Sequence, residues 1–114
     1  MQPGDVYWID YPPTNGREQA GRRPGIVLQD DTAAGTSPLV LTIPLTTTAG
    51  LGGHLPAVVD VPADAQNGLS ADSYALVFQL RATDRRRFRG RIGTVSAAVL
   101  AQVYQALDRL TGHP

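Results

Sequence analysis

The sequence predicts a single, mainly β domain that ends in one α-helix. Short runs of β-branched and aromatic residues, each closed by a cluster of turn-forming residues, fill most of the chain. After Ser96 the apolar spacing changes to three and four, the period of an amphipathic helix. The connections are too short for crossover helices, which argues against a parallel sheet. A small, partly closed barrel with a helix packed against it satisfies these observations. The 114 residues, 1–114, are expected to form one domain.

Three strands are expected in the first half of the chain. "DVYWIDY" (5–11) is rich in aromatic and β-branched residues, and the Pro12-Pro13 pair ends it because proline cannot donate to a ladder. After a glycine-rich loop, "PGIVLQ" (24–29) contains three consecutive apolar residues, which is typical of a strand buried on both faces. "LVLTIPLTTT" (39–48) reads as the third strand. Pro44 inside it predicts an edge position or a bulge.

Three shorter strands and the helix follow. The strands are "PAVVDV" (56–61), "YALVFQL" (74–80) and "RIGTVS" (91–96), with turn-rich segments between them. Ser96 is a good N-cap for the helix, and Gly112 stands where helices commonly end. The apolar stripe of this helix consists of Val99, Leu100, Val103, Leu107 and Leu110.

The net charge of zero hides an uneven distribution of charge. Every Lys/Arg position is arginine, and residues 1–80 hold three arginines against eight acids. Residues 81–114 hold seven arginines against two acids, most of them in "RATDRRRFRGR". Two interpretations stay open: a solvated face paired with the acidic half, or a patch that binds phosphate through bidentate guanidinium groups.

Several kinds of site are not expected. Without cysteine the chain has no disulfide and no thiolate metal site. His54 and His113 are far apart and belong to no metal-binding motif, so neither a metal nor a cofactor is expected. No apolar run approaches the roughly 20 residues that span a bilayer, and the start of the chain lacks the features of a signal peptide. A cytoplasmic location is therefore expected, with no membrane partner.

Guanidinium, carboxylate and hydroxyl groups remain as candidates for chemistry. Glu18 and Arg23 flank one loop, and Thr46, Thr47 and Thr48 stand where the third strand runs into another. If the second and third strands are neighbours, these threonines lie beside Arg23. An arginine and a hydroxyl aimed at one point form an oxyanion or phosphate cradle. The alternative is a surface ion pair between Glu18 and Arg23, worth under about 1 kcal/mol.

The chain resembles the MazF/PemK toxins, endoribonucleases of bacterial type II toxin–antitoxin systems. "GDVYWIDYPPTNGREQAGRRPGIVLQ" carries a Gly-Asp-aliphatic-aromatic strand, then P-T-x-G-x-E-Q-x-G-x-R-P and aliphatics. "SPLVLTIPLTTT" is similar to the strand that ends in the family's threonine, and "DSYALVFQLRATDRRRF" to D-[SG]-x-[AI]-L-x-x-Q-[IVL]-[RK]. The likeness covers nearly the whole chain, including the terminal helix.

The resemblance implies an SH3-like β-barrel with an appended helix, forming a homodimer. It implies metal-independent, sequence-specific cleavage of single-stranded RNA to 2′,3′-cyclic phosphate and 5′-hydroxyl ends. The family's catalytic arginine falls on Arg23, its threonine on Thr46 and its E-Q glutamate on Glu18. Whether Glu18 or Arg23 accepts the proton stays open, although a carboxylate is chemically the easier base.

Further positions are expected to bind RNA, and an acidic antitoxin protein is the expected partner by the same resemblance. The expected RNA-binding residues are Gln19, Arg22, Thr47, Gln79 and Arg81. Two alternatives remain on the same scaffold. One is a toxin like the CcdB gyrase poisons, which the ending Leu110–Pro114 disfavours because it lacks the Trp-Gly-Ile of those proteins. The other is a catalytically inactive module that binds RNA or antitoxin.

Overall fold

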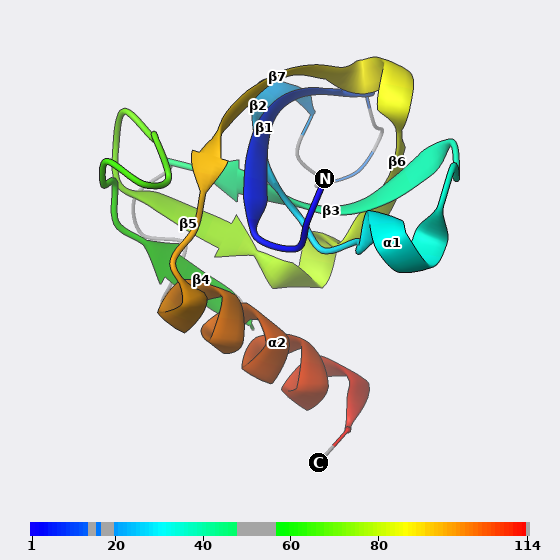
Figure 1. Cartoon of the computed structure of the whole chain (residues 1–114). Coiled ribbons are helices and arrows are strands. Elements are labelled where there is room, and N and C mark those ends of the chain that lie inside the picture. Colours follow the sequence, from blue (N-terminus) through cyan, green and yellow to red (C-terminus); the bar gives the residue numbers. More distant parts are fainter. Residues whose placement is uncertain (14–15, 17–19, 48–56, 114) are drawn as a thin grey trace.

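The computed structural model describes residues 1–13, 16, 20–47 and 57–113, and these form a mainly β domain with a C-terminal helix (Figure 1). The expected fold class is thus confirmed. The first expected strand and the terminal helix have the predicted bounds. In chain order the elements are β1 (Asp5–Tyr11), β2 (Gly21–Val27), α1 (Asp31–Ala34), β3 (Leu39–Thr46), β4 (Val58–Val61), β5 (Ser73–Leu76), the 3₁₀ turn η1 (Val77–Gln79), β6 (Arg81–Asp84), the 3₁₀ turn η2 (Arg85–Arg87), β7 (Phe88–Thr94) and α2 (Ala97–Thr111).

All strand pairs are antiparallel, and the sheet curls round a long central strand, β3. Five strands follow the order β6-β3-β2-β1-β7, and the two at its edges are consecutive in the chain, joined through η2. The two edges of the curved sheet are therefore brought together by the chain itself, through η2, and not by a hydrogen-bonded ladder (Figure 1). β5 pairs with the far end of β3, and β4 pairs with β5. The result is the small, partly closed barrel that the sequence predicts.

Pro44 does not lie in an edge strand, so that part of the prediction is wrong. β3 is paired with β2 on one side and with two strands in succession on the other. Residues 39–42 pair with β6, and residues 45–46 pair with β5. Pro44 falls between these two stretches, where the strand changes partners. Its missing N–H therefore interrupts neither of these two ladders.

Other bounds differ from the expectation for local reasons. β2 begins at Gly21, three residues earlier than expected, with Gly21 at φ +82°. The expected strand 74–80 ends at Leu76, and η1 replaces its second half. α1 was not expected; it begins because the Asp30 side chain accepts a hydrogen bond from the Thr32 amide. β6, also unexpected, is charged in sequence and owes its form to pairing with β3.

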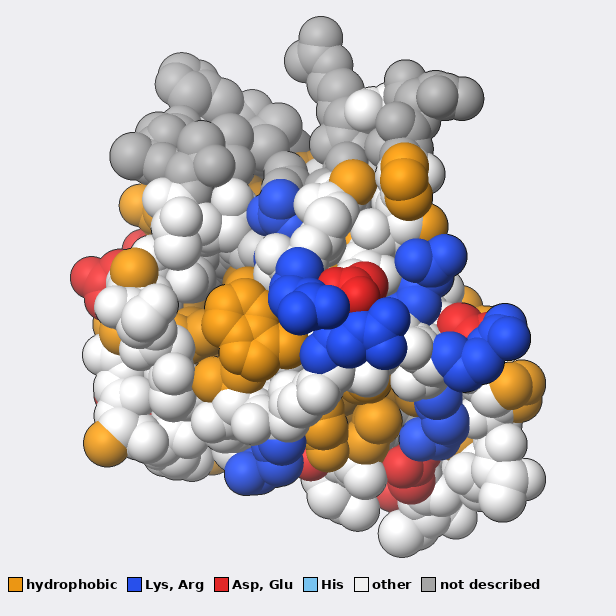
Figure 2. Space-filling view, turned by 90° about the horizontal axis from the view of Figure 1, so that it is seen from above, with side chains coloured by type: hydrophobic (Ala, Val, Ile, Leu, Met, Phe, Trp, Pro, Cys, Tyr) orange, Lys and Arg blue, Asp and Glu red, His pale blue; other side chains and the backbone are white. Residues whose placement is uncertain are grey.

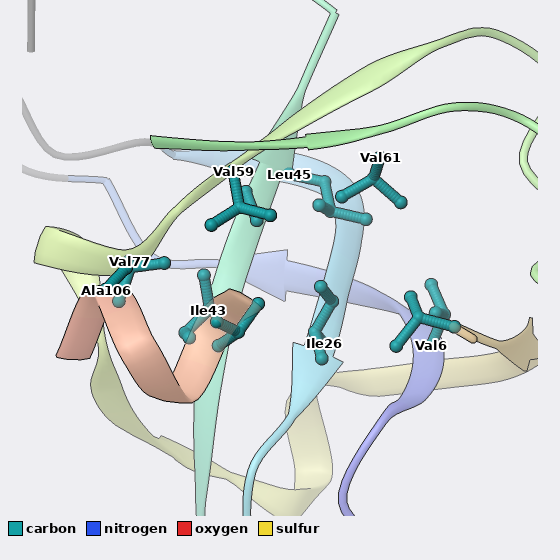
Figure 3. Packing of buried hydrophobic residues seen from close by; sticks show 11 residues of the cluster. Val6, Ile26, Ile43, Leu45, Val59, Val61, Val77 and Ala106 are labelled. Atoms are coloured by element: carbon teal, nitrogen blue, oxygen red, sulfur yellow. The ribbon is translucent and has the colours of Figure 1, made fainter. Parts of the chain in front are cut away.

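The main hydrophobic core lies between the curled sheet and α2 (Figure 3). Ser96 caps the helix by accepting from the Val99 amide, and Gly112 ends it in the left-handed conformation, both as predicted. Val103 is fully buried in this core, whereas Leu110 at the end of the predicted stripe is exposed. The core consists of Val6, Ile26, Ile43, Leu45, Val59, Val61, Ala75, Val77, Val95, Val103 and Ala106.

A second buried group fills the inside of the curl. Tyr11 lies there, and its hydroxyl is 2.9 Å from Thr42 Oγ1, which is 3.0 Å from Thr83 Oγ1. All three side chains are buried. A Cβ at Gly25 would overlap the Tyr11 hydroxyl and the Ile9 side chain, so the small residue makes room for this hydroxyl chain. Among the described residues, no helix is long and apolar enough to cross a membrane.

Gly25→Ala is expected to lower the free energy of unfolding by about 1–3 kcal/mol, because a methyl group there overpacks the inside of the curl. Urea unfolding measures the change. Gly90→Ala is the matched control, since a Cβ at Gly90 meets nothing within 4 Å. Equal stability of the Gly25 variant and the wild-type protein would contradict this packing.

Candidate active site

The pairing of β2 with β3 brings Arg23 and Thr46 to one place. The ladder pairs Gly25 with Pro44, Ile26 with Ile43 and Val27 with Thr42. The ladder ends at the Gly25–Pro44 pair, and Arg23 and Thr46 lie two residues beyond it on their own strands. Side chains two residues apart on a strand project from the same face of the sheet. The two strands are neighbours, as the sequence analysis required.

The guanidinium of Arg23 is held by carbonyl oxygens. Its Nε and Nη2 donate to the Ala20 carbonyl at 3.1 and 3.0 Å, and its Nη1 lies 3.5 Å from the Leu45 carbonyl. Partial burial lowers the pKa of Arg23 from its ordinary value, and the nearby Tyr11 opposes the shift. An arginine still carries its full charge at neutral pH. The contacts therefore fix the cation without neutralising it.

Four of the predicted site residues border one pocket of about 390 Å³. Arg22, Arg23, Thr46 and Thr47 all border it. Glu18 and Gln19 lie outside the described residues. The complete lining is Trp8, Arg22, Arg23, Pro24, Leu45, Thr46, Thr47, Gly68, Leu69, Ser70, Ala71, Ser73 and Ile92.

Gln79 and Arg81 are not part of the pocket lining. Gln79 belongs to η1 and Arg81 begins β6. The guanidinium carbon of Arg81 lies 4.2 Å from the centre of the Tyr11 ring, a cation–π contact. Arg81 and Arg23 both act on Tyr11 through their charges, but burial dominates and raises the pKa of Tyr11 to about 12. The positive charges of Arg23 and Arg81 therefore both act on Tyr11. The sequence analysis did not identify Tyr11 as a neighbour of these two arginines.

The wall of the pocket opposite β2 comes from the connection between β4 and β5. Its course depends on Asn67, whose side chain is buried. The Asn67 amide donates to the Pro62 carbonyl, and its oxygen accepts from the Asp64 and Leu69 amides. These bonds hold residues 68–71 against the pocket. The Asn-Gly pair at 67–68 was the one signal in the sequence for this tight turn.

Most arginines of the C-terminal cluster pair with aspartates. Arg85 contacts Asp31 at 2.6 Å and Arg89 contacts Asp10 at 2.6 Å, while Arg91 lies 3.5 Å from Asp5 and Arg86 2.9 Å from Asp84. Three of these four aspartates belong to the first strand and to α1, in the acidic half of the chain. For Arg85, Arg89 and Arg91 the paired-face interpretation is therefore correct, whereas Arg86 pairs with Asp84 next to its own cluster. The arginines gather round carboxylates on one face, beside an exposed apolar area (Figure 2).

Asp10 links this cluster to the pocket. Arg22 Nε donates to its carboxylate at 2.7 Å, and Arg89 Nε donates to the other oxygen at 2.6 Å. The bonds from Arg22 and then Arg89 hold the pKa of Asp10 well below its usual range. Arg22 therefore reaches the rim of the pocket with its charge partly compensated, in contrast to Arg23. Among the described residues, no group of three or more His, Cys, Asp or Glu could hold a metal ion.

Comparisons with known proteins agree on one family. Residues 2–111 match the family model described as PemK-like, MazF-like toxin of type II toxin-antitoxin system. The endoribonuclease MazF of Staphylococcus epidermidis is 32% identical over 105 residues, covering 92% of this chain and 86% of the relative. The endoribonuclease EndoA of Bacillus subtilis is 33% identical over 105 residues, covering 92% and 89%.

Solved structures give the same picture. The crystal structure of MazF (Form-I) from Deinococcus radiodurans has a TM-score of 0.82 and 31% identity, covering 98% of this chain and 96% of that one. A MazE-MazF structure (Form-II) from the same organism has a TM-score of 0.74 and 30% identity, covering 100% and 97%. The fold around the pocket is therefore similar to that of MazF structures.

The buried phenol of Tyr11 makes stability depend on alkaline pH. An ordinary tyrosine loses its proton near pH 10, whereas Tyr11 keeps it to about pH 12 in the folded protein. The folded state therefore binds more protons in this window. The contribution of Tyr11 is complete below pH 10 and is lost as the pH rises towards 12. Two pKa units correspond to about 2–3 kcal/mol.

Urea unfolding at about pH 9 and about pH 11.5 tests this for the wild-type protein and Tyr11→Phe. The wild-type protein is expected to lose more stability between the two pH values, because the variant has no proton to release there. The same loss in both proteins would contradict the burial of an intact phenol.

Proposed function

The chain belongs to the family of PemK-like, MazF-like toxins of type II toxin–antitoxin systems, and we propose that it is an endoribonuclease whose catalytic site is the pocket at Arg23 and Thr46. The observation that carries the site is the pocket that Arg23 and Thr46 both border, which is large enough for part of a nucleotide. The comparisons favour this activity over binding to gyrase, since the similar proteins are named endoribonucleases.

The reaction needs no nucleophile from the protein. The 2′-hydroxyl of the RNA attacks the neighbouring phosphorus; a bond forms from O2′ to phosphorus and the bond from phosphorus to O5′ breaks. One proton leaves the 2′-hydroxyl and one is delivered to O5′, so the products carry a 2′,3′-cyclic phosphate and a 5′-hydroxyl. The protein has to align the phosphate, move these two protons and balance the developing charge. The need for a 2′-hydroxyl explains a choice of RNA over DNA.

We assign to Arg23 the role of balancing the negative charge that develops on the phosphate. Within the described residues its hydrogen-bond partners are carbonyl oxygens, so its positive charge is available to a phosphate. Thr46 is 5% exposed and borders the same pocket, where its hydroxyl can donate to a non-bridging oxygen. An arginine fork and a hydroxyl at one phosphate form the cradle that the sequence suggested.

The proton acceptor is a choice between Glu18 and Arg23. A carboxylate at Glu18 accepts a proton readily at neutral pH, whereas a guanidinium has to lose one first. Burial lowers the pKa of Arg23, which moves it towards that role without removing its charge. We assign the base to Glu18 and the electrostatic role to Arg23.

The remaining partners complete the proposal. RNA binding involves Gln19, Arg22, Thr47, Gln79 and Arg81. A cognate antitoxin protein is the regulatory partner, in line with the MazE-MazF structure from Deinococcus radiodurans. The chain acts as a single domain, 1–114, that forms a homodimer and works in the cytoplasm.

Purified protein is expected to cut a long RNA in EDTA into discrete fragments with cyclic-phosphate and 5′-hydroxyl ends. Sequencing of the 5′-hydroxyl ends from a mixed RNA pool identifies both the chemistry and the preferred sequence.

Arg23→Ala should lower kcat/KM at least a hundredfold, because a charged donor to the transition state is lost. Arg109→Ala, at an exposed position in the last turn of α2, is the matched control and should cut normally. An Arg23→Ala protein that cuts as fast as the wild type would refute the site.

Thr46→Val keeps the shape of the side chain but removes its hydroxyl. The expected result is a loss of about ten- to a thousandfold in kcat, as for other single donors to a developing oxyanion. Thr46→Ser should restore most of the activity, because it returns the hydroxyl. Single-turnover cleavage assays measure both variants. If the valine and serine variants cut equally well, the hydroxyl has no role.

A pH–rate profile tests the choice of base. Glu18→Gln should cut much more slowly, and its residual kcat/KM should lack the fall that the wild type shows below neutral pH, where a carboxylate base becomes protonated. A wild-type acid limb that persists unchanged in the glutamine variant would contradict the assignment of Glu18.

A further inference from the structure

Trp8 is the aromatic side chain of β1 that remains uncovered. Tyr7 packs edge-on against Phe88 at 5.5 Å between ring centres, and Tyr11 is buried beneath Arg81. Trp8 is 42% exposed. Among the described residues, its indole takes part in no ring stacking and in no hydrogen bond. A large ring left exposed on a strand loses the hydrophobic stabilisation that burial would give.

The neighbouring strands leave the indole open rather than cover it. Trp8 pairs with Pro24 on β2 and with Gly90 on β7. Gly90 has no side chain, and a Cβ there would meet nothing within 4 Å. A cross-strand side chain normally packs against its neighbour. On the β7 side, the residue paired with Trp8 therefore has no side chain that could cover the indole.

Trp8 borders the same pocket as the two proposed catalytic residues. Arg23 and Thr46 supply one polar part of the lining, and Trp8, Leu69 and Ile92 supply an apolar part. A ligand that fits both parts carries an anion and a flat apolar surface close together. A nucleotide has this combination, since its phosphate is joined through a sugar to an aromatic base.

We propose that the exposed indole of Trp8 is a stacking platform for the nucleobase of a nucleotide next to the phosphate held by Arg23 and Thr46. This inference rests on the proposed function and adds a binding subsite to it. Stacking on an aromatic side chain is tolerant of base identity, because every base has a π-face. Trp8 therefore contributes to RNA affinity rather than to the choice of sequence or to the chemical step.

The single tryptophan makes this subsite observable by fluorescence. The wild-type protein is titrated with short 2′-O-methyl oligonucleotides of uridine, adenosine and cytidine, which cannot be cut because the attacking hydroxyl is blocked. An abasic oligomer with the same number of phosphates is the control ligand. A saturable decrease in tryptophan emission with the base-containing oligomers, and much less with the abasic one, is expected. Equal changes with both kinds of oligomer, or none, would overturn the proposal.

Variants separate stacking from packing. Trp8→Ala should raise the Kd for these oligomers and the KM for RNA cleavage roughly ten- to a hundredfold, with kcat nearly unchanged. Trp8→Phe keeps a π-face and should recover most of the affinity. Tyr104→Ala is the matched control, because Tyr104 is 40% exposed on α2 and does not border the pocket. Phenylalanine and alanine variants with the same weakened binding would overturn stacking.

The two proposals fail in different ways. A wild-type protein that cuts no RNA refutes the proposed function, whereas the titration with uncleavable oligomers still reports on Trp8. A protein that cuts RNA while Trp8→Ala binds and cuts like the wild type refutes the stacking platform alone. In that case the exposed indole would face a protein partner instead.

Discussion

The antiparallel register between β2 and β3 is the constraint on which the site depends. It pairs Gly25 with Pro44, and Arg23 and Thr46 lie two residues beyond this pair on their own strands. A slip of one residue would turn the threonine to the other face of the sheet. The register itself is protected by the buried interior, where Gly25 leaves room for the hydroxyl of Tyr11 and Tyr11 bonds to Thr42 on β3. The same two strands, β2 and β3, therefore contribute both to the buried packing inside the curl and to the proposed site at Arg23 and Thr46.

Arg23 differs from five other arginines in the kind of contact that holds it. Arg22, Arg85, Arg86, Arg89 and Arg91 contact aspartates, and these pairs compensate much of the basic cluster. Arg23 is instead anchored by the carbonyls of Ala20 and Leu45, which orient it but leave its charge in place. An anion that enters the pocket thus meets an oriented cation whose bonds to the protein need not be broken. The apolar part of the lining, with Trp8, gives the same pocket a second surface of different chemistry.

The sequence predicted those parts of the molecule that depend on local signals. Ser96 and Gly112 mark the helix because capping is a local interaction. Arg23 and Thr46 were singled out by the resemblance to the MazF/PemK toxins, and both border one pocket. β6 was missed, since its residues Arg81–Asp84 have no apolar alternation and become a strand only by pairing with β3. The exposure of Trp8 and the wall at residues 68–71 were missed too. They depend on Gly90 lying across from the indole and on the side-chain bonds of Asn67, which are contacts between distant parts of the fold.

The central claim is that Arg23 and Thr46 act together on one phosphate, and a double-mutant cycle tests it most directly. Cleavage rates are measured for Arg23→Ala, for Thr46→Val and for the double variant. Groups that stabilise the same transition state are strongly non-additive, so the double variant should be little slower than the slower of the two single variants. If the two losses simply multiply, the residues act independently, and the shared site at the β2–β3 register is contradicted.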